Sequence, residues 1–450
     1  MSKKAALHNL GCKVNAYETE AMQEMLEKAG YEIVPFKEGA DVYVINTCTV
    51  TNIADRKSRQ MLHRARKMNP DAVVVAAGCY VQAQEGKVDS CIDIVLGNNK
   101  KKDLIRILDE YRKSRAESGR EKEILPDVEL EDIGHTKEYE SLNLTRPGDH
   151  TRAYIKVQDG CNQFCTYCII PYARGRVRSR QTKDVLEEVR DLAGNGYKEV
   201  VLTGIHLTSY GVDNNKGSLL EVIMRLDKID GLQRIRLGSL EPRVITEEFA
   251  KTLSSSKKIC PHFHLSLQSG CDTVLKRMNR KYTTQEYYDK CYILRKYFNN
   301  PAITTDVIVG FPQETEEEFE ATKVFLEKVH FYEMHIFKYS RRKGTVADRM
   351  EGQVDEKVKT QRSAILLELE NKMSKEYRQQ HIGKTEEVLI EEIVSENGKD
   401  YFMGFTPDYI RVKIACDTAL DNSEYINTIK KVYMKELSDD GIVVTGIFEC

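Results

Sequence analysis

Two long stretches of the chain alternate short apolar runs with helix-like patterns, which restricts the fold to parallel α/β architectures. The first stretch covers residues 4–115. Its apolar runs, which predict strands, are Ala5–Leu10, Val42–Asn46, Val73–Ala77 and Ile92–Leu96. Its helical patterns are Tyr17–Ala29, Ile53–Met68 and Lys101–Arg115. Strand, loop and helix repeated in this order predict a doubly wound parallel sheet.

Three cysteines of this stretch each follow a predicted strand directly: Cys12, Cys48 and Cys79. The carboxyl ends of the strands of an open parallel sheet share one edge, where ligands bind. Three thiols meeting there would hold an iron-sulfur cluster that is one protein ligand short. The alternative is that they are small buried residues, because free cysteine is often part of a core. Cys91 has no such position and is interpreted as a core residue.

A second alternating series follows a polar linker over residues 116–150, which has room for one strand. The predicted strands are Ala153–Gln158, Glu199–Thr203, Arg234–Gly238, His262–Leu267, Ile303–Val309 and Glu333–Tyr339. The predicted helices are Lys183–Ala193, Leu219–Leu226, Thr246–Leu253, Gln285–Phe298 and Glu316–Val329. Six strands fall short of the eight of a complete TIM barrel, so the series predicts a partial (βα)6 barrel.

The last part of the chain has a different pattern. A charged helix over Asp355–His381 leads to short alternating runs at Glu387–Ile393, Tyr409–Ile414 and Ile442–Phe448. Gly, Asn and Asp separate these runs, which predicts a small antiparallel β-barrel. We therefore expect four parts: an N-terminal domain over 1–115, a linker over 116–150, a partial barrel with its connecting helix over 151–381 and a β-barrel over 382–450.

Cys161, Cys165 and Cys168 follow the first strand of the second series, separated by three residues and then by two. Disulfides use cysteines in pairs, so three close thiols indicate a metal or cluster with one coordination position left over. A loop with this cysteine spacing can surround one cubane iron-sulfur cluster. Three of its irons then receive a protein ligand, and the fourth is open to a small molecule. A zinc site is the alternative, but no fourth Cys or His lies nearby in the sequence.

Composition indicates in which cellular compartment the protein acts. The chain has 12 cysteines, no run of 18 apolar residues and no apolar signal segment after Met1. Cysteines in such a chain favour metal or redox chemistry over disulfides. We therefore expect a cytoplasmic protein without a membrane partner. The net charge of -2 favours no particular partner by itself.

The three-cysteine loop at the mouth of a predicted partial barrel, with Tyr167 directly before Cys168, resembles the radical S-adenosylmethionine superfamily. That resemblance implies that Cys161, Cys165 and Cys168 hold a 4Fe-4S cluster. It also implies that the methionine part of S-adenosylmethionine chelates the open iron. One electron then cleaves the cosubstrate to a 5'-deoxyadenosyl radical, which abstracts hydrogen from an unactivated carbon.

The stretch from Gly160 to Gly175, with three strand-end cysteines before it and a small β-barrel after it, is similar to the methylthiotransferases over nearly the whole chain. Members of this family have an N-terminal domain with an auxiliary cluster, a radical domain and a C-terminal TRAM domain. The resemblance implies that Cys12, Cys48 and Cys79 bind the auxiliary 4Fe-4S cluster, which delivers the sulfur. One S-adenosylmethionine methylates that sulfur and a second activates the acceptor. An external electron donor and a sulfur source are implied as partners.

Members of the family differ in their acceptor, which is isopentenyladenosine in tRNA, a ribosomal-protein aspartate or threonylcarbamoyladenosine in tRNA. The stretches Gly11–Asn15, Leu202–His206 and Arg174–Arg180 look like the last branch. The resemblance therefore predicts methylthiolation at C2 of N6-threonylcarbamoyladenosine in the tRNA anticodon stem-loop. A sister methylthiotransferase is the nearer alternative, and a non-enzymatic iron-sulfur RNA-binding sensor is the more distant one.

The predicted substrate-binding residues are four arginines in one basic stretch: Arg174, Arg176, Arg178 and Arg180. Arginine binds carboxylates bidentately, which suits an acceptor with a carboxylate beside its modified base. The branch acting on isopentenyladenosine usually has an acidic residue where Arg176 stands. The alternative is that these side chains attract phosphate without specificity.

The resemblance also assigns a cosubstrate pocket. Its predicted residues are Tyr167, Ser239, Glu241, Ser266, Gln268 and Gly310. Most of them follow predicted strands and offer hydroxyl, carboxylate or amide groups to ribose and methionine, while Gly310 lets the backbone approach adenine. Alternatively, the polar side chains are ordinary caps.

The predicted C-terminal barrel is acidic, since residues 380–450 hold 14 acidic and 7 basic side chains. A TRAM domain is expected to bind RNA, so contact here would need a local positive face or stacking. The candidate stacking residues are Tyr401, Phe402, Phe405 and Tyr409.

Overall fold

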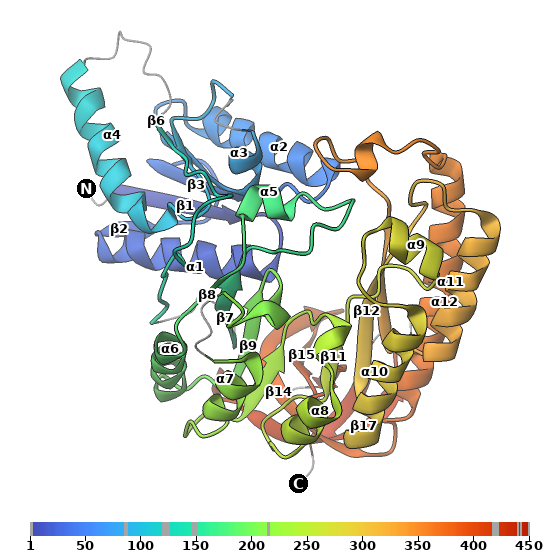
Figure 1. Ribbon diagram of the computed structural model, residues 1–450. Helices are drawn as coiled ribbons and strands as arrows, with labels where there is room; N and C mark the ends of the chain where they lie inside the picture. Colours follow the sequence, from blue (N-terminus) through green and yellow to red (C-terminus); the bar gives the residue numbers. More distant parts are fainter. Residues whose placement is uncertain are drawn as a thin grey trace.

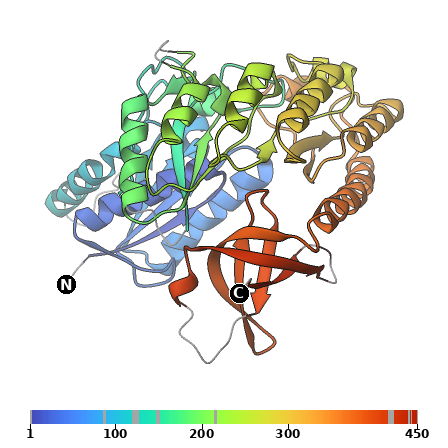
Figure 2. The same ribbon diagram turned by 90° about the horizontal axis from the view of Figure 1, so that it is seen from below.

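A computed structural model describes residues 3–84, 89–118, 127–145, 151–213, 217–415, 423–438, 441 and 443–448. Figure 1 shows an N-terminal α/β layer beside a half-barrel of strands and helices. Figure 2, a view from below, shows the C-terminal barrel next to the half-barrel. No helix in the described part of the chain is both long and apolar enough to cross a membrane.

The N-terminal sheet is parallel, as predicted, and its strand order is β2-β1-β3-β4-β5-β6. The strands are β1 (Lys3–Asn9), β2 (Tyr31–Ile33), β3 (Val42–Thr47), β4 (Val73–Gly78), β5 (Ile94–Leu96) and β6 (Asp127–Glu129). The helices are α1 (Lys13–Lys28), α2 (Asn52–Met68), α3 (Cys79–Ala83) and α4 (Leu104–Ser118). Apolar residues of α1 and α4 pack on one face of the sheet, and those of α2 and α3 pack on the other. The strand order reverses between β1 and β3, which is where doubly wound folds bind ligands.

The segment predicted as a linker belongs partly to this N-terminal layer. Its strand β6 is the edge strand of the sheet beside β5. Leu142 and Leu144 are buried against Tyr17 and Ala21 of α1. Residues 119–126 and 146–150 of the linker lie outside the described residues. The linker is therefore more firmly packed than its polar composition predicts.

The central part is a half-barrel, which confirms the predicted partial (βα)6 barrel. Its parallel strands are β7 (Arg152–Asp159), β9 (Glu199–Gly204), β10 (Arg234–Leu237), β11 (His262–His264), β12 (Ala302–Val309) and β13 (Glu333–Lys338). Isolated parallel bridges connect the β10 and β11 segments, and the short strand β8 (Arg178–Ser179) pairs antiparallel with β7. The helices are α5 (Ile170–Arg174), α6 (Thr182–Gly194), α7 (Leu219–Leu226), α8 (Glu247–Ser254), α9 (Asp272–Arg277), α10 (Thr284–Tyr297), α11 (Glu316–Val329) and α12 (Glu356–Gln379). The sequence patterns had not predicted α5, α9 or β8, because each is short.

The C-terminal part is a closed barrel with the strand order β14-β15-β16-β18-β17. The strands are β14 (Thr385–Glu396), β15 (Lys399–Phe405), β16 (Arg411–Ala415), β17 (Ile429–Leu437) and β18 (Val444–Phe448). All pairs are antiparallel except β16 and β18, which are parallel, so the prediction of a purely antiparallel barrel is corrected here. Short 3-10 helices complete the described secondary structure: Lys101–Asp103, Leu207–Ser209, Pro242–Val244, Ala347–Arg349 and Ser423–Tyr425.

The C-terminal barrel docks on the amino ends of the half-barrel strands. Arg234 and Arg236 of β10 donate to backbone carbonyl oxygens of Glu387, Phe405 and Pro407, at 2.8 to 2.9 Å. Arg236 is also held by Glu199, whose carboxylate lies 2.7 Å away. The carboxyl ends of the strands, where the cysteine loop lies, are therefore left to the N-terminal layer.

Candidate active site

The structure brings Cys12, Cys48 and Cys79 to the carboxyl edge of the N-terminal sheet. Cys12 is the N-cap of α1, Cys48 follows β3, and Cys79 is the first residue of α3. Gly11 has a positive φ of 118°, and a Cβ there would stand 3.0 Å from the Cβ of Cys48. A glycine therefore permits the close approach of the Cys12 and Cys48 loops.

The surroundings of Cys12 and Cys48 oppose negative charge on these two thiols. The pKa of Cys48 is raised to about 11, first by burial and also by the neighbouring Cys79 and Cys12, since like charges repel. Desolvation by the surrounding protein raises the pKa of Cys12 as well. Two such thiols suit a ligand that brings positive charge to this edge.

The donor set fits a polynuclear cluster better than a single ion. Among the described residues, three groups of side chains have their ligand atoms within 4.8 Å of one another, and neither cysteine triad is among them. Sulfurs around one zinc ion lie closer than this, because each is about 2.3 Å from the metal. More widely spaced thiols without a fourth ligand match a 4Fe-4S cluster with one open iron.

The second triad lies on the loop between β7 and α5. Gly160, which begins this loop, has a φ of 70°, and a Cβ there would overlap the carbonyl oxygen of Arg176. Cys161 and Cys165 are buried and Cys168 is half-buried. Burial raises the pKa of Cys161 to about 11 and that of Cys168 to about 12, and Cys165 repels charge on both. The three thiols therefore form a second compact donor set.

Nitrogen donors point at sulfur in both triads. Arg280 donates from Nη1 to the Sγ of Cys165 at 3.3 Å, and the backbone N–H of Gln163 donates to the Sγ of Cys161 at 3.4 Å. In the other triad Cys79 is the acceptor. Its sulfur receives Nε of Arg174 at 3.2 Å and Nδ2 of Asn98 at 3.5 Å. Sequence reasoning missed Arg280 and Asn98, because no spacing pattern links them to the cysteines.

The predicted cosubstrate residues lie at the carboxyl ends of β10 and β11, beside Arg280. The backbone carbonyl of Ser266 accepts from Arg280 at 3.2 Å and from the Tyr282 hydroxyl at 2.7 Å. The Gln268 backbone, with a φ of 75°, exchanges hydrogen bonds with β12. Glu241 is buried and pairs with Arg243 at 2.7 Å. Ser239 is exposed.

Tyr167 and Gly310 lie at the same rim. The ring of Tyr167 contacts Phe311 edge-on, with centroids 6.5 Å apart, and burial raises the pKa of its hydroxyl well above its ordinary value. A Cβ at Gly310 would overlap the side chain of Lys359. The N–H of Gly310 donates to Glu314 at 2.6 Å. Glycine is therefore explained here by packing against α12, and its contact with adenine stays a prediction.

Histidine is also part of the rim. His206 follows β9, and its Nδ1 lies 2.6 Å from the Ser209 hydroxyl. Burial lowers the pKa of His206 to about 4, and the nearby charges of Arg280 and Arg243 add to this effect. The imidazole is therefore neutral at pH 7 and adds no charge to the rim.

Three of the four predicted substrate-binding arginines are buried, which corrects that prediction. Arg174 pairs with Glu18 and Asp159, Arg178 lies 3.8 Å from Asp159, and Arg180 pairs with Glu188. Their exposed fractions are at most 1%. A buried arginine needs a partner within the protein, and these partners come from the N-terminal layer and the half-barrel. These three arginines are therefore held by partners inside the protein rather than facing solvent.

Arg176 alone of the four is exposed, and it lines a cleft of about 1110 Å³. Its guanidinium lies 4.5 Å from the ring of Phe164, which in turn meets the 51% exposed Tyr172 edge-on at 5.7 Å. Other residues that line the cleft are Asn52, Asp55, Gln82, Glu131, Asp132, His135, Ile169, Arg342 and Lys343. Several of these are within four residues of Cys48, Cys79, Cys165 or Cys168. The cleft is therefore lined by sequence neighbours of cysteines from both triads, and the cysteines themselves are not among its lining residues.

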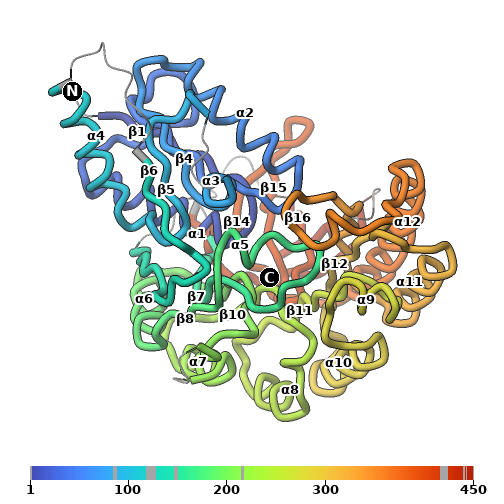
Figure 3. The backbone as a smooth tube through the Cα atoms, turned by 45° about the horizontal axis from the view of Figure 1, so that its top comes forward, coloured from blue at the N-terminus to red at the C-terminus, as the bar shows by residue number. Residues whose placement is uncertain are grey.

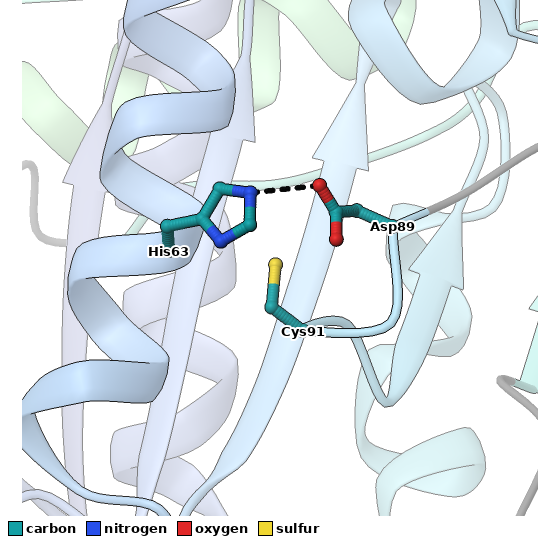
Figure 4. A group of neighbouring side chains, drawn as sticks. All are labelled: His63, Asp89 and Cys91. Carbon is teal, nitrogen blue, oxygen red and sulfur yellow. Dashed lines mark hydrogen bonds and ion pairs between the residues drawn. The ribbon is translucent and has the colours of Figure 1, made fainter.

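The remaining cysteines of the described chain join neither triad. Cys91 is buried, as predicted, but it lies beside His63 and Asp89, which are 2.7 Å apart (Figure 4). Cys260 and Cys291 are buried and Cys271 is half-buried. Cys416 and Cys450 lie outside the described residues.

Two family profiles match the chain. The profile of the Radical SAM superfamily matches residues 155–326, which include the three-cysteine loop. The profile of Uncharacterized protein family UPF0004 matches residues 4–97, which include the three strand-end cysteines. The two cysteine sets thus fall in separately recognisable parts of the sequence.

Similar proteins agree with these profiles. The chain is 44% identical over 411 residues to "Threonylcarbamoyladenosine tRNA methylthiotransferase MtaB" of Bacillus subtilis (strain 168), covering 90% of this chain and 89% of the relative. It is 36% identical over 440 residues to "tRNA-2-methylthio-N(6)-dimethylallyladenosine synthase" of Acetivibrio thermocellus, covering 95% and 89%. The solved structure of the radical S-adenosylmethionine methyltransferase TsrM from Kitasatospora setae shares the fold, with a TM-score of 0.56 at 17% identity over 75% of this chain and 73% of that one. The chain therefore belongs to the radical S-adenosylmethionine methylthiotransferase family.

Proposed function

We propose that this enzyme inserts a methylthio group at C2 of N6-threonylcarbamoyladenosine next to the anticodon of tRNA. The relative named for this activity is 44% identical, whereas the relative named for dimethylallyladenosine is 36% identical. Arg176 supports this acceptor, because it is an exposed cation in the cleft where the sister branch usually has an acid. A guanidinium binds the carboxylate of a threonylcarbamoyl group bidentately.

The proposed cofactors are two 4Fe-4S clusters and S-adenosylmethionine. Cys161, Cys165 and Cys168 would hold one cluster, and Cys12, Cys48 and Cys79 the other. When bound, the first supplies the electron that cleaves S-adenosylmethionine to a 5'-deoxyadenosyl radical, and the second supplies the sulfur. An external electron donor and a sulfur source are further proposed partners.

One observation carries this proposal: a single cleft is lined by sequence neighbours of cysteines from both triads. Gln82 lies on the helix that begins with Cys79, and Phe164 directly precedes Cys165. A base inserted between them would lie near the donors of both triads. Water is displaced from such a site by the base itself, which protects a radical from side reactions.

The cleft offers a surface for unpaired RNA. Bases of single-stranded loops stack on aromatic rings and on guanidinium planes, and they do so with little dependence on sequence. Phe164, Tyr172 and Arg176 present two rings and a cation at the wall of the cleft. We propose that they receive bases of the anticodon loop.

The cosubstrate would lie deeper, at the carboxyl ends of the half-barrel strands. Ser239 and Glu241, which follow β10, and Ser266 and Gln268, which follow β11, would bind its ribose and methionine parts. Arg280 would orient this pocket, because it joins the Ser266 carbonyl to the sulfur of Cys165.

The domain division at 115, 150 and 381 and the assignment of the C-terminal barrel as a TRAM domain belong to the same proposal. The predicted RNA contacts of that barrel need other residues than those first considered. Phe405 and Tyr409 face the half-barrel, Phe402 is 2% exposed, and Lys413 covers the ring of Tyr401 at 4.3 Å. Because its substrate is tRNA, we expect the enzyme to act in the cytoplasm.

Nucleoside analysis of tRNA from a deletion strain tests the function. We expect the methylthiolated form of threonylcarbamoyladenosine to disappear. Its precursor without the methylthio group, N6-threonylcarbamoyladenosine, should accumulate. Loss of methylthiolated isopentenyladenosine instead would assign the enzyme to the sister branch, and an unchanged nucleoside profile would exclude both. Re-expression of a Cys161→Ala variant should not restore the modification, whereas Cys271→Ala, which changes a cysteine outside both triads, should restore it.

A further inference from the structure

We propose that Arg174 is a positioning residue that sets the reduction potential of the cluster bound through Cys79. The inference rests on the proposed two-cluster function and adds a role that the cysteines alone do not have. Arg174 is the last residue of α5, which begins two residues after Cys168. One turn of helix therefore connects the loop of Cys161, Cys165 and Cys168 to Arg174. Figure 3 shows α5 beside α3, the helix that begins with Cys79.

All five N–H groups of Arg174 point at acceptors. Nη1 and Nη2 donate to Glu18 at 2.8 and 3.0 Å, to Asp159 at 3.1 Å and to Asn15 at 2.7 Å. Nε is left for the Sγ of Cys79 at 3.2 Å. The carboxylates fix the plane of the guanidinium, so the direction of Nε toward sulfur is determined by the other contacts.

The buried network around Arg174 contains one more cation than carboxylates. Its cations are Lys101, Lys156, Arg174 and Arg178, and its carboxylates are Glu18, Glu140 and Asp159. All seven side chains are at most 3% exposed. Four cations face three carboxylates, so one positive charge remains for another partner. A buried charge needs such a partner, and the thiolate of Cys79 is the anion within hydrogen-bond reach.

Hydrogen bonds to ligand sulfurs raise the reduction potential of an iron-sulfur cluster. They reduce the negative charge on the sulfurs, so an added electron is repelled less strongly. Asn98 donates to the same sulfur at 3.5 Å, so two side chains donate to Cys79. The backbone N–H groups of Asn15 and Val50 are the donors to Cys12 and Cys48. The side-chain donors are thus concentrated on the thiol that α5 contacts through Arg174. The arrangement points to Cys79 as the ligand through which the protein tunes this cluster.

The test uses the full chain carrying Cys161→Ala, Cys165→Ala and Cys168→Ala. Only Cys12, Cys48 and Cys79 then remain as proposed cluster ligands. EPR-monitored titration of the reconstituted protein gives the midpoint potential, and its iron content and circular dichroism are measured on the same sample. Arg174→Lys keeps the charge but removes the Nε donor. We expect a midpoint more negative than that of the parent protein. Arg180→Lys is the matched control, since it changes a buried arginine that touches no sulfur, and we expect no shift.

The outcomes separate this inference from the proposed function. A bound cluster whose midpoint is unchanged by Arg174→Lys would overturn the role of Arg174 and leave the two-cluster proposal standing. A parent protein without iron would overturn both. Where Arg174→Lys does not fold by circular dichroism, Asn98→Ala decides, because it removes the second donor to the same sulfur and should shift the midpoint in the same direction by a smaller amount.

Discussion

Tyr409 of the C-terminal barrel stacks on His262 of β11, with ring centroids 4.9 Å apart and ring planes 16° apart. The guanidinium groups of Arg152 and Arg236 lie 5.1 and 4.7 Å from the same ring. Tyr409 has a φ of 71°, which an aromatic residue adopts only where its surroundings hold it. These partners lie at the amino ends of the half-barrel strands, opposite the cysteine loop. The ring therefore anchors the barrel rather than binding substrate.

Replacing Tyr409 by Ala should loosen this docking. Truncation of a large packed aromatic side chain costs about 3 kcal/mol, and the two cation contacts are lost with it. We expect earlier thermal unfolding and faster proteolysis of the C-terminal barrel. Tyr433→Ala removes a 41% exposed ring of the same barrel and should have little effect. Equal behaviour of the two variants would refute the anchor.

The two triads should be separable by chemistry. Reconstituted protein should contain about eight iron atoms, and loss of either triad should leave about four. Alanine at Cys161, Cys165 or Cys168 should abolish reductive cleavage of S-adenosylmethionine. Alanine at Cys12, Cys48 or Cys79 should spare that cleavage and stop sulfur transfer. Iron analysis and assay of 5'-deoxyadenosine check this, and about four irons in the unaltered protein would contradict the two-cluster proposal.

Cluster binding by the loop that carries Cys161, Cys165 and Cys168 should depend on Gly160. Gly160→Ala puts a Cβ into the carbonyl of Arg176, and the backbone there cannot move without displacing Cys161. We expect the variant to bind about half the iron of the unaltered protein. Gly196→Ala is a matched control, because its φ of 96° is equally unfavourable but nothing lies within 4 Å of the added Cβ. It should cost only about 1 kcal/mol of stability and keep its iron.

Binding of tRNA should depend on the exposed ring in the cleft. Stacking of one base on an aromatic side chain contributes about 1 to 3 kcal/mol, so Tyr172→Ala should weaken binding of an anticodon stem-loop roughly tenfold or more. Fluorescence anisotropy with a labelled stem-loop measures this. The control is Tyr292→Ala, which removes a 63% exposed ring on α10. If both variants bind RNA equally well, Tyr172 is not part of the interface.

Stability should fall as the pH falls through the range set by His206. Its folded-state pKa of about 4 lies below the ordinary 6.5, so the unfolded chain takes up a proton that the folded protein excludes. The penalty is absent above pH 6.5, grows by about 1.4 kcal/mol per pH unit below it and is complete near pH 4. His206→Asn should therefore gain stability relative to the unaltered protein between pH 7 and 4.5, as measured by urea unfolding. His330→Asn, at a 47% exposed site, should show a smaller change.

Local patterns determined much of the architecture. The apolar runs predicted all six parallel strands of the half-barrel, and their alternation with helical patterns predicted the parallel N-terminal sheet. This was possible because apolar residues recur about every two residues along a half-buried strand and every 3.6 residues along an amphipathic helix. Cysteine positions after strands placed the N-terminal triad at one sheet edge, since parallel strands share their carboxyl ends. The sequence patterns did not predict β2 and β8, and they predicted no more than room for one strand in the segment that contains β6. Two or three residues are too few to give a periodic signal.

The tertiary structure alone decided what the arginines do. Arg174, Arg176, Arg178 and Arg180 are the same residue type at a spacing of two, so the sequence offers no reason to separate them. Only Arg176 reaches the cleft, because acids distant in sequence, Glu18, Asp159 and Glu188, stand where the other three side chains point. Contacts between side chains 8 to 156 residues apart leave no trace in a local pattern. The sequence therefore indicated which cysteines could hold a cofactor, and the folded chain decided which of the four arginines lines the cleft and which one donates to the sulfur of Cys79.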